Sequence, residues 1–342
     1  MTKKPKVAYL FGAGASCKAM PLLSGLTEAL EKHANFIQGF RDHDPSTSPT
    51  QLREGALLPD TVDRYCTAML TLAKNASAHA SVDTYAKRLF LTDKRIDAFN
   101  LKLLLTTYFS YKQKPPAPLD DRYDALFASI LTRGKNGFPQ VNEDVMLLTW
   151  NYDLQLPLAL KPYYYDSRTE YLLQGLGLAT LDRVNERPEI PSVVHLNGIA
   201  AWRDRETIMP VIPDICANDL EQVMRMLDYF LAGDQPYYPG AELTLLHFAW
   251  ENDARVVAGR TKLIEHLSEC EVLVAIGYSF PFFNRTVDRE IIGGMKSLSK
   301  VYLQSRPDGI NAMVNAFKAI PLRDVEIETY EAVDKFMLPP EL

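Results

Sequence analysis

The sequence has few cysteines and no long apolar run. Four of its 342 residues are cysteine, and Cys17, Cys66, Cys216 and Cys270 stand far apart without a CxxC pair. This spacing argues against a disulfide framework and against a zinc site, and it fits the reducing cytoplasm. No apolar segment reaches the length of a membrane span, and the basic residues 1–6 lead into a short apolar stretch rather than a secretory signal core.

An excess of basic charge is also missing. The chain carries 43 acidic and 37 basic residues, a formal net charge of −6. A broad surface for direct nucleic-acid binding is therefore not favoured. A hydrophobic content of 47% and a charged content of 23% are ordinary for a globular protein that buries a full core.

A glycine-rich turn follows the first apolar segment. Residues 7–11 predict a buried strand, Gly12-Ala-Gly-Ala-Ser16 predicts a turn, and a helix is expected from about Leu26. Strand, glycine turn and helix together bring backbone N–H groups and a helix N-terminus to a phosphate pair. The two glycines would let the backbone approach a ligand closely, because they carry no Cβ. A plain strand-to-helix turn is the structural alternative.

Two features of the usual dinucleotide fingerprint are absent. Cys17 stands where a further glycine is expected, and no second strand with an acidic end follows about 20 residues later. The sequence therefore predicts a nucleotide site but argues against a standard reductase or dehydrogenase.

The apolar pattern changes along the chain. Helical periodicity dominates residues 55–135, whereas strand-like segments alternate with helices afterwards. Such alternation predicts a parallel sheet with helices on both faces. We therefore expect an α/β fold: one domain over residues 1–342, with a Rossmann-like core at 5–40 and 140–310 and an inserted helical lobe at about 55–135. The expected strands are 7–11, 145–149, 192–196, 208–212, 271–276, 299–304 and 324–330, and expected helices include 122–132 and 250–270.

Polar or glycine residues follow the strongest predicted strands. In an open parallel sheet, ligands bind beyond the carboxyl ends of the strands. Each group alone is ordinary turn chemistry, but together they predict one nucleotide site. The groups are Gly12, Ala13, Gly14 and Ser16; Asn151 and Asp153; His195, Asn197 and Gly198; Gly277 and Ser279; and Gln304.

These motifs carry a resemblance to a known family. Gly12-Ala-Gly-Ala-Ser16, Thr149-Trp-Asn-Tyr-Asp153, the His195 to Gly198 strand end and Gly277-Tyr-Ser-Phe280 occur with sirtuin-like order and spacing. The chain resembles the sirtuin-like NAD-consuming proteins of bacterial antiphage defence, over residues 5 to 305. The resemblance implies a Rossmann-like domain and a helical lobe with NAD in the cleft between them.

The resemblance also implies roles for the motif residues. The glycine turn would hold the pyrophosphate, and Asn151 would contact the nicotinamide ribose and place water. Asp153 would lie near the carboxamide. Gly277 and Ser279 would match the adenosine half, with Gln304 bordering the adenine.

The chain departs from the family in two ways. It lacks the four-cysteine zinc module of the deacylases, so no zinc is expected and a deacylase is disfavoured. The family's catalytic histidine directly precedes a glycine, but here Asn197 does, and His195 lies two positions earlier. Alternate strand residues point to the same side, so His195 could still reach the site. Alternatively, His195 is a core residue, Asn197 binds ligand, and no general base is present.

The resemblance implies an NAD glycohydrolase in which Asn151 orients water and His195 accepts a proton. A sensor that binds NAD or ADP-ribose with little catalysis is the alternative, as is an NAD-dependent deacylase or ADP-ribosyltransferase. Defence proteins of this type are kept silent until triggered. The resemblance therefore also implies a homo-oligomer or a separate partner such as an ATPase or helicase.

Overall fold

A computed structural model describes most of the chain in two compact units. The first unit comprises Met1–Met20, Leu119–Ile199 and His247–Leu342, and the second comprises Pro21–Pro118 and Ala200–Leu246. The sequence also predicts an exposed loop over 41–54 and a helix with an apolar stripe over 220–231, and most of both segments lies outside the described residues. The described residues are 3–42, 57–79, 81–113, 119–134, 137, 139–163, 178–186, 192–203, 210–211, 227, 230, 244–322 and 324–342.

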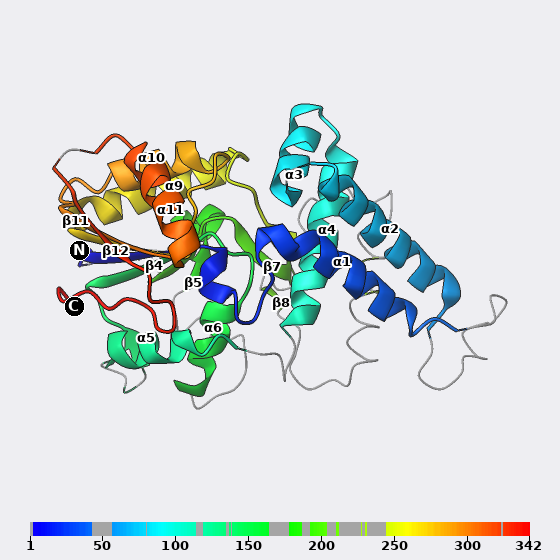
Figure 1. The fold of residues 1–342 in the computed structure, drawn as a ribbon, viewed down its shortest axis with the longest axis horizontal. Helices are drawn as coiled ribbons and strands as arrows, with labels where there is room; N and C mark the ends of the chain where they lie inside the picture. The colour runs from blue at the N-terminus through cyan, green and yellow to red at the C-terminus, as the bar shows by residue number, and fades with distance from the viewer. Residues whose placement is uncertain are drawn as a thin grey trace. The chain divides into compact units, whose positions relative to one another are not determined.

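A seven-stranded parallel sheet forms the centre of the first unit (Figure 1). Its strand order is β12-β11-β10-β1-β4-β6-β5, and every neighbouring pair runs parallel. This confirms the predicted Rossmann-like α/β sheet. The strands are β1 (Val7–Phe11), β4 (Val145–Thr149), β5 (Leu178–Thr180), β6 (Val193–His195), β10 (Val272–Ile276), β11 (Lys300–Gln304) and β12 (Glu326–Tyr330).

Helices cover both faces of this sheet, as Figure 1 shows. Side chains of a strand alternate between the faces. Ala8 and Leu10 of β1 join the apolar cluster of α9 (Ala254–His266), α10 (Arg285–Gly293) and α11 (Pro307–Lys318). Phe11 instead packs its ring 5.8 Å from Tyr123 of α5 (Arg122–Ile130). The smaller elements of the unit are α6 (Gln155–Leu160), β2 (Leu131–Arg133), β3 (Pro139–Val141), η1 (Ala13–Ser16), η3 (Lys161–Tyr163), η4 (Leu181–Glu186) and η5 (Leu267–Glu269).

The C-terminal segment, residues 331–342, packs on the same face as Phe11. The Phe336 ring is buried 5.8 Å from Phe11 and 4.9 Å from Tyr123. Tyr9 donates a hydrogen bond of 3.2 Å to the carbonyl of Met337. This segment forms no helix or strand. Its contacts with Tyr9 and Phe11 of β1 attach it to the sheet.

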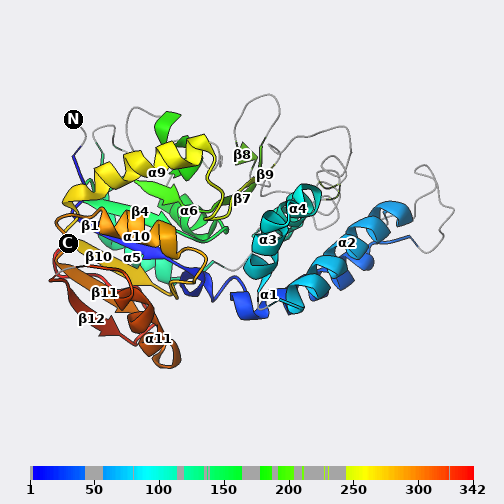
Figure 2. The ribbon, with the colours of Figure 1, turned by 90° about the horizontal axis from the view of Figure 1, so that it is seen from above.

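Helices make up most of the described part of the second unit. Figure 2 shows α1 (Leu23–Gln38) and α2 (Pro59–Ser77) side by side, with α3 (Val82–Leu91) and α4 (Arg95–Lys112) next to them. Ser81 caps α3, as its sequence position predicts, by accepting the N–H of Thr84 at 3.1 Å. A three-stranded sheet has the order β8-β7-β9, with β7 (Gly198–Arg203), β8 (Pro210–Val211) and β9 (Thr244–Leu246).

The unit boundaries differ from those expected at both ends of the helical region. We expected residues 5–40 in the core, but α1 belongs to the second unit, where His33 contacts the Tyr65 hydroxyl of α2 at 3.0 Å. We expected residues up to 135 in the lobe, but α5 belongs to the first unit because Tyr123 packs on Phe11. The apolar pattern predicts each helix but does not show which neighbour it covers.

Two expected helices are shorter in the structure. The helix expected over 250–270 begins at Ala254, because the Asp253 carboxylate accepts the N–H groups of Arg255 and Val256 at 2.9 Å each. The helix expected over 122–132 ends at Ile130, because β2 pairs antiparallel with β3. Of the helices in the described ranges, none has the length and apolar character needed to cross a membrane.

Candidate functional site

The carboxyl ends of the central strands lie at one edge of the sheet in the first unit. Phe11 at the end of β1 is in register with Thr149 of β4 and Ile276 of β10, and Thr149 is in register with His195 of β6. The next strands of this sheet, β4, β5 and β6, lie on one side of β1, whereas β10, β11 and β12 lie on its other side. The strand order therefore switches direction at β1. This is the place where open α/β sheets bind ligands.

The glycine turn after β1 interlocks with the turn after β10. The N–H of Gly12 donates to the carbonyl of Ile276 at 3.0 Å, and that of Gly14 donates to Gly277 at 2.9 Å. A Cβ on Gly12 would lie 2.6 Å from the Cα of Tyr278, and one on Gly14 would lie 2.7 Å from the Cα of Gly277. Close packing against the turn after β10 therefore requires glycine at both positions, in addition to the close approach to a ligand that the sequence predicts. Ala13 is half-buried between them, and its N–H has no partner among the described residues.

Asn151 joins the end of β4 to this turn. Its buried side-chain amide donates to the carbonyl of Gly12 at 2.9 Å and to the hydroxyl of Ser16 at 3.2 Å. Its backbone N–H donates to the Thr149 hydroxyl at 3.0 Å. Both amide hydrogens are thus committed inside the protein, and the side-chain oxygen is the group left to accept a hydrogen bond from a ligand.

His195 lies at the end of β6 and is completely buried, with 0% exposure. Its Nδ1 is 3.3 Å from the backbone carbonyl of Asn151, which can only accept, so Nδ1 carries the proton. In the neutral ring the lone pair is then on Nε2, which is buried and has no hydrogen-bond partner among the described residues. Burial lowers the pKa of His195 to about 4, against the opposing effect of the Asn151 carbonyl. The ring is therefore neutral near pH 7.

Leu196 and Asn197 form the turn beyond His195, and Gly198 begins β7. The side-chain amide of Asn197 donates to the carbonyl of Trp150 at 3.3 Å. Its buried Oδ1 has no hydrogen-bond partner among the described residues, and its backbone carbonyl accepts the N–H of His247 at 2.7 Å. Gly198 has a φ of +71°, a backbone conformation that favours glycine, so the glycine is explained by the backbone and needs no ligand.

Ser16 and Asp153 lie inside the site rather than on its surface. Both are buried, and the Ser16 hydroxyl is 3.4 Å from the hydroxyl of Tyr123. Burial raises the pKa of Asp153 to about 6, although hydrogen bonds from the Gln155 N–H and from Ser16 act in the opposite direction. The Asp153 carboxyl therefore keeps its proton to a higher pH than an ordinary aspartate does.

Ser279 and Gln304 differ in how exposed they are to solvent. Ser279 is exposed in the loop after β10. The amide of Gln304 instead donates to the carbonyls of Ala332 and Lys335 and accepts the N–H of Met337 at 2.9 Å. Its polar groups are thus committed to the C-terminal segment, whereas the resemblance implies that Gln304 borders an adenine.

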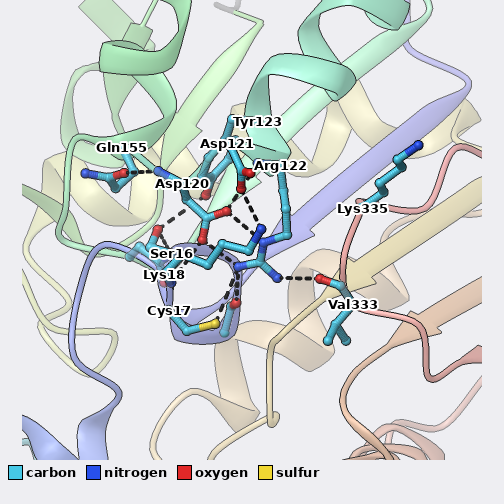
Figure 3. A network of polar contacts seen from close by, with 12 residues as sticks. Ser16, Cys17, Lys18, Asp120, Asp121, Arg122, Tyr123, Gln155, Val333 and Lys335 are labelled. Atoms are coloured by element: carbon cyan, nitrogen blue, oxygen red, sulfur yellow. Dashed lines mark hydrogen bonds and ion pairs between the residues drawn. The ribbon is translucent and has the colours of Figure 1, made fainter. Parts of the chain in front are cut away.

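A buried ion pair that sequence reasoning missed supports the glycine turn (Figure 3). Nη2 of Arg122 is 2.6 Å from the carboxylate of Asp120 and donates to the carbonyl of Gly14 at 2.9 Å. The same guanidinium donates to the carbonyl of Val333 at 3.2 Å, and Asp120 also accepts the N–H of Lys18 at 3.1 Å. In the sequence, Leu-Asp-Asp-Arg-Tyr looks like an exposed helix start, and no local signal indicates burial.

A second missed residue, Asp288 of α10, joins the loops after β4 and β10. Its buried carboxylate accepts the indole N–H of Trp150 at 3.1 Å and the hydroxyl of Tyr278 at 2.9 Å. Burial raises the pKa of Asp288 to about 7, although these two hydrogen bonds lower it. Trp150 directly precedes Asn151, and Tyr278 directly follows Gly277, so Asp288 positions both loops.

Replacing Asp288 by Asn is expected to flatten the pH dependence of stability. The carboxyl ionises near pH 4 when unfolded and at about 7 when folded, so the folded state holds the extra proton between these values. Wild-type stability therefore falls as pH rises through this window, by about 4 kcal/mol from this group. Urea unfolding from pH 4 to pH 8 measures the slope. Asp308→Asn removes an exposed carboxylate from α11 as a control, and an unchanged slope in Asp288→Asn would contradict the assignment.

Among the described residues, no group of three or more His, Cys, Asp or Glu side chains could hold a metal ion. No protein-family model matches the chain, and no curated protein matches it either.

Proposed function

We propose that the chain is an NAD glycohydrolase that cleaves NAD to nicotinamide and ADP-ribose at the sheet edge of the first unit. The observation that carries the proposal is a continuous hydrogen-bonded series across three strand ends. The Gly12 carbonyl and Ser16 hydroxyl hold the Asn151 amide, and the Asn151 carbonyl fixes the proton on His195. Such a series holds an acceptor oxygen and a basic nitrogen in fixed positions, which is what positioning a nucleophile requires.

The chemistry of the substrate sets what these residues must do. The nicotinamide of NAD is a cationic leaving group, so the C–N bond breaks with its electron pair going to the nicotinamide nitrogen. An oxocarbenium-like ribose remains, as in glycoside hydrolysis. In the proposal, the Asn151 oxygen orients a water at the anomeric carbon, and the water oxygen forms the new bond. The water proton passes to Nε2 of His195, the nitrogen that bears the lone pair.

The other motif residues would bind the dinucleotide. The N–H of Ala13 would donate to the pyrophosphate, and Asp153 would hold the nicotinamide amide. With a pKa raised to about 6, Asp153 is mostly ionised at pH 7 and can accept that amide's N–H. Through the resemblance, we extend the proposal to NAD depletion in antiphage defence in the cytoplasm, held silent by self-assembly or by a partner such as an ATPase or helicase.

One observation favours a second candidate, a sensor that binds NAD or ADP-ribose. The His195 side chain has no exposed surface, and a pKa lowered to about 4 makes it a weak base. A site with these properties could hold the nucleotide without hydrolysing it.

When the purified protein is incubated with NAD, we expect nicotinamide and ADP-ribose to be released in equal amounts. Liquid chromatography measures both products. Nicotinamide with the ADP-ribosyl group attached to another molecule would indicate a transferase or deacylase. NAD binding by calorimetry without nicotinamide release would favour the sensor or an enzyme that awaits its partner. Absence of both binding and release would overturn the site.

A further inference from the structure

Phe282 exposes an aromatic ring in the loop between β10 and α10. Its exposure is 72%, and it is the one exposed aromatic side chain in the described part of the first unit. Two residues of this loop have positive φ, +58° at Gly277 and 49° at Phe280. The turn at Phe280 sends that ring into the core, 5.4 Å from Phe317, while Phe282 stays outside.

Neighbouring side chains hold the exposed ring in place. The guanidinium carbon of Arg285 lies 5.2 Å from the centre of the Phe282 ring. Phe283 meets Phe282 edge-on at 6.2 Å, and Phe283 itself packs 5.8 Å from the buried Trp250. A supported ring beside a planar cation loses little freedom when a further planar group stacks on it.

The ring belongs to the loop that is expected to lie at the adenosine half of the proposed substrate. The loop begins at Gly277, at the switch in strand order where a dinucleotide would lie. Gln304, the residue expected to border the adenine, has its amide committed to the C-terminal segment. Ser279, exposed in the same loop, offers a hydroxyl to the same part of a ligand.

We propose that Phe282, supported by Arg285, binds the adenine ring of NAD by stacking. The inference rests on the proposed function, since it takes NAD as the ligand. Stacking needs a flat uncharged base and no particular hydrogen-bond pattern, so the Phe282 ring contributes affinity for the adenosine half, and discrimination between bases comes from other groups.

The test uses ADP-ribose, AMP and ribose 5-phosphate, none of which contains the bond that the proposed reaction breaks. In Phe282→Ala, calorimetry is expected to show binding of ADP-ribose and AMP weakened by about 5- to 150-fold. Ribose 5-phosphate lacks the base, so its affinity stays unchanged. Phe282→Trp retains a stacking surface and restores the affinity for ADP-ribose and AMP.

Phe90→Ala is the matched control. Phe90 lies on α3 of the second unit with 48% exposure, and Lys87 sits 5.1 Å from the centre of its ring. This variant also removes an exposed aromatic ring beside a cation, but in the second unit, so nucleotide binding should not change. Unchanged binding of all three ligands in Phe282→Ala would overturn the inference, as would an equal loss for all three. A change in oligomeric state with unchanged nucleotide binding would assign Phe282 to a protein contact instead.

The same measurements separate this inference from the proposed function. If the wild-type protein binds ADP-ribose through Phe282 but releases no nicotinamide, the stacking contact stands, and the result favours the sensor or an enzyme that awaits its partner. If the wild-type protein releases nicotinamide while Phe282→Ala binds ADP-ribose normally, the hydrolase proposal stands and the stacking inference fails. If the wild-type protein binds none of the ligands, both proposals fail.

Discussion

Replacement of Asn151 by alanine is expected to lower nicotinamide release by at least about 100-fold. The variant loses the oxygen proposed to orient water. It also leaves the Gly12 carbonyl and the Ser16 hydroxyl without the amide that donates to them at 2.9 and 3.2 Å. Because the group acts on the attacking water, the loss should appear in kcat more than in KM. Steady-state kinetics with NAD measures both constants.

Asn75→Ala is a suitable control for this experiment. Asn75 is on α2 of the second unit, and its amide donates to the Tyr85 hydroxyl at 3.0 Å, so the variant also removes a partly buried amide contact. Nicotinamide release should be retained in this control. Circular dichroism must show that Asn151→Ala is folded. Full release by both Asn151→Ala and His195→Ala would rule out the catalytic assignment.

Replacement of Arg122 by methionine is expected to lower the free energy of unfolding by about 3–5 kcal/mol. The Asp120 side chain has 0% exposure, so loss of the guanidinium leaves a buried carboxylate without its counter-charge. The Gly14 and Val333 carbonyls lose a donor in the same change. Urea unfolding at pH 7 measures the loss.

Two further variants test the physical reason. The double variant Asp120→Asn with Arg122→Met removes both charges and should recover much of the lost stability, because no buried charge remains unpaired. Lys32→Met breaks the exposed pair with Glu28 on α1 and should lower the stability far less, because water solvates both groups in this pair. Equal losses in Arg122→Met and Lys32→Met would contradict the role of burial.

The sequence predicts the strong central strands well. Apolar runs place β1, β4, β10 and β11 within one residue of their observed bounds, because these strands are buried on both faces. It does not predict β5 or β2, each of three residues. So short a segment has no periodicity of its own, and its pairing partner decides its structure.

For the site, the motifs predict which residues reach the sheet edge but not how they are used. Gly12, Asn151 and His195 come together as expected, because each lies at or just beyond the end of one of three neighbouring strands. The contacts of Arg122 with Gly14 and Val333, and of Gln304 with Met337, join segments distant in sequence, and no local pattern encodes them. The sirtuin-like family membership and the NAD chemistry stay predictions.

The position of β1 in the sheet has a consequence for synthesis on the ribosome. β1 is made first, yet one of its two neighbours, β10, ends at Ile276, and the glycine turn of β1 closes only against Gly277. Until that late segment leaves the exit tunnel, one side of β1 is an unpaired apolar edge open to wrong pairing. The nascent chain therefore has to protect this side of β1 until residues 272–277 are made, after which β11 and β12 extend the sheet beyond β10.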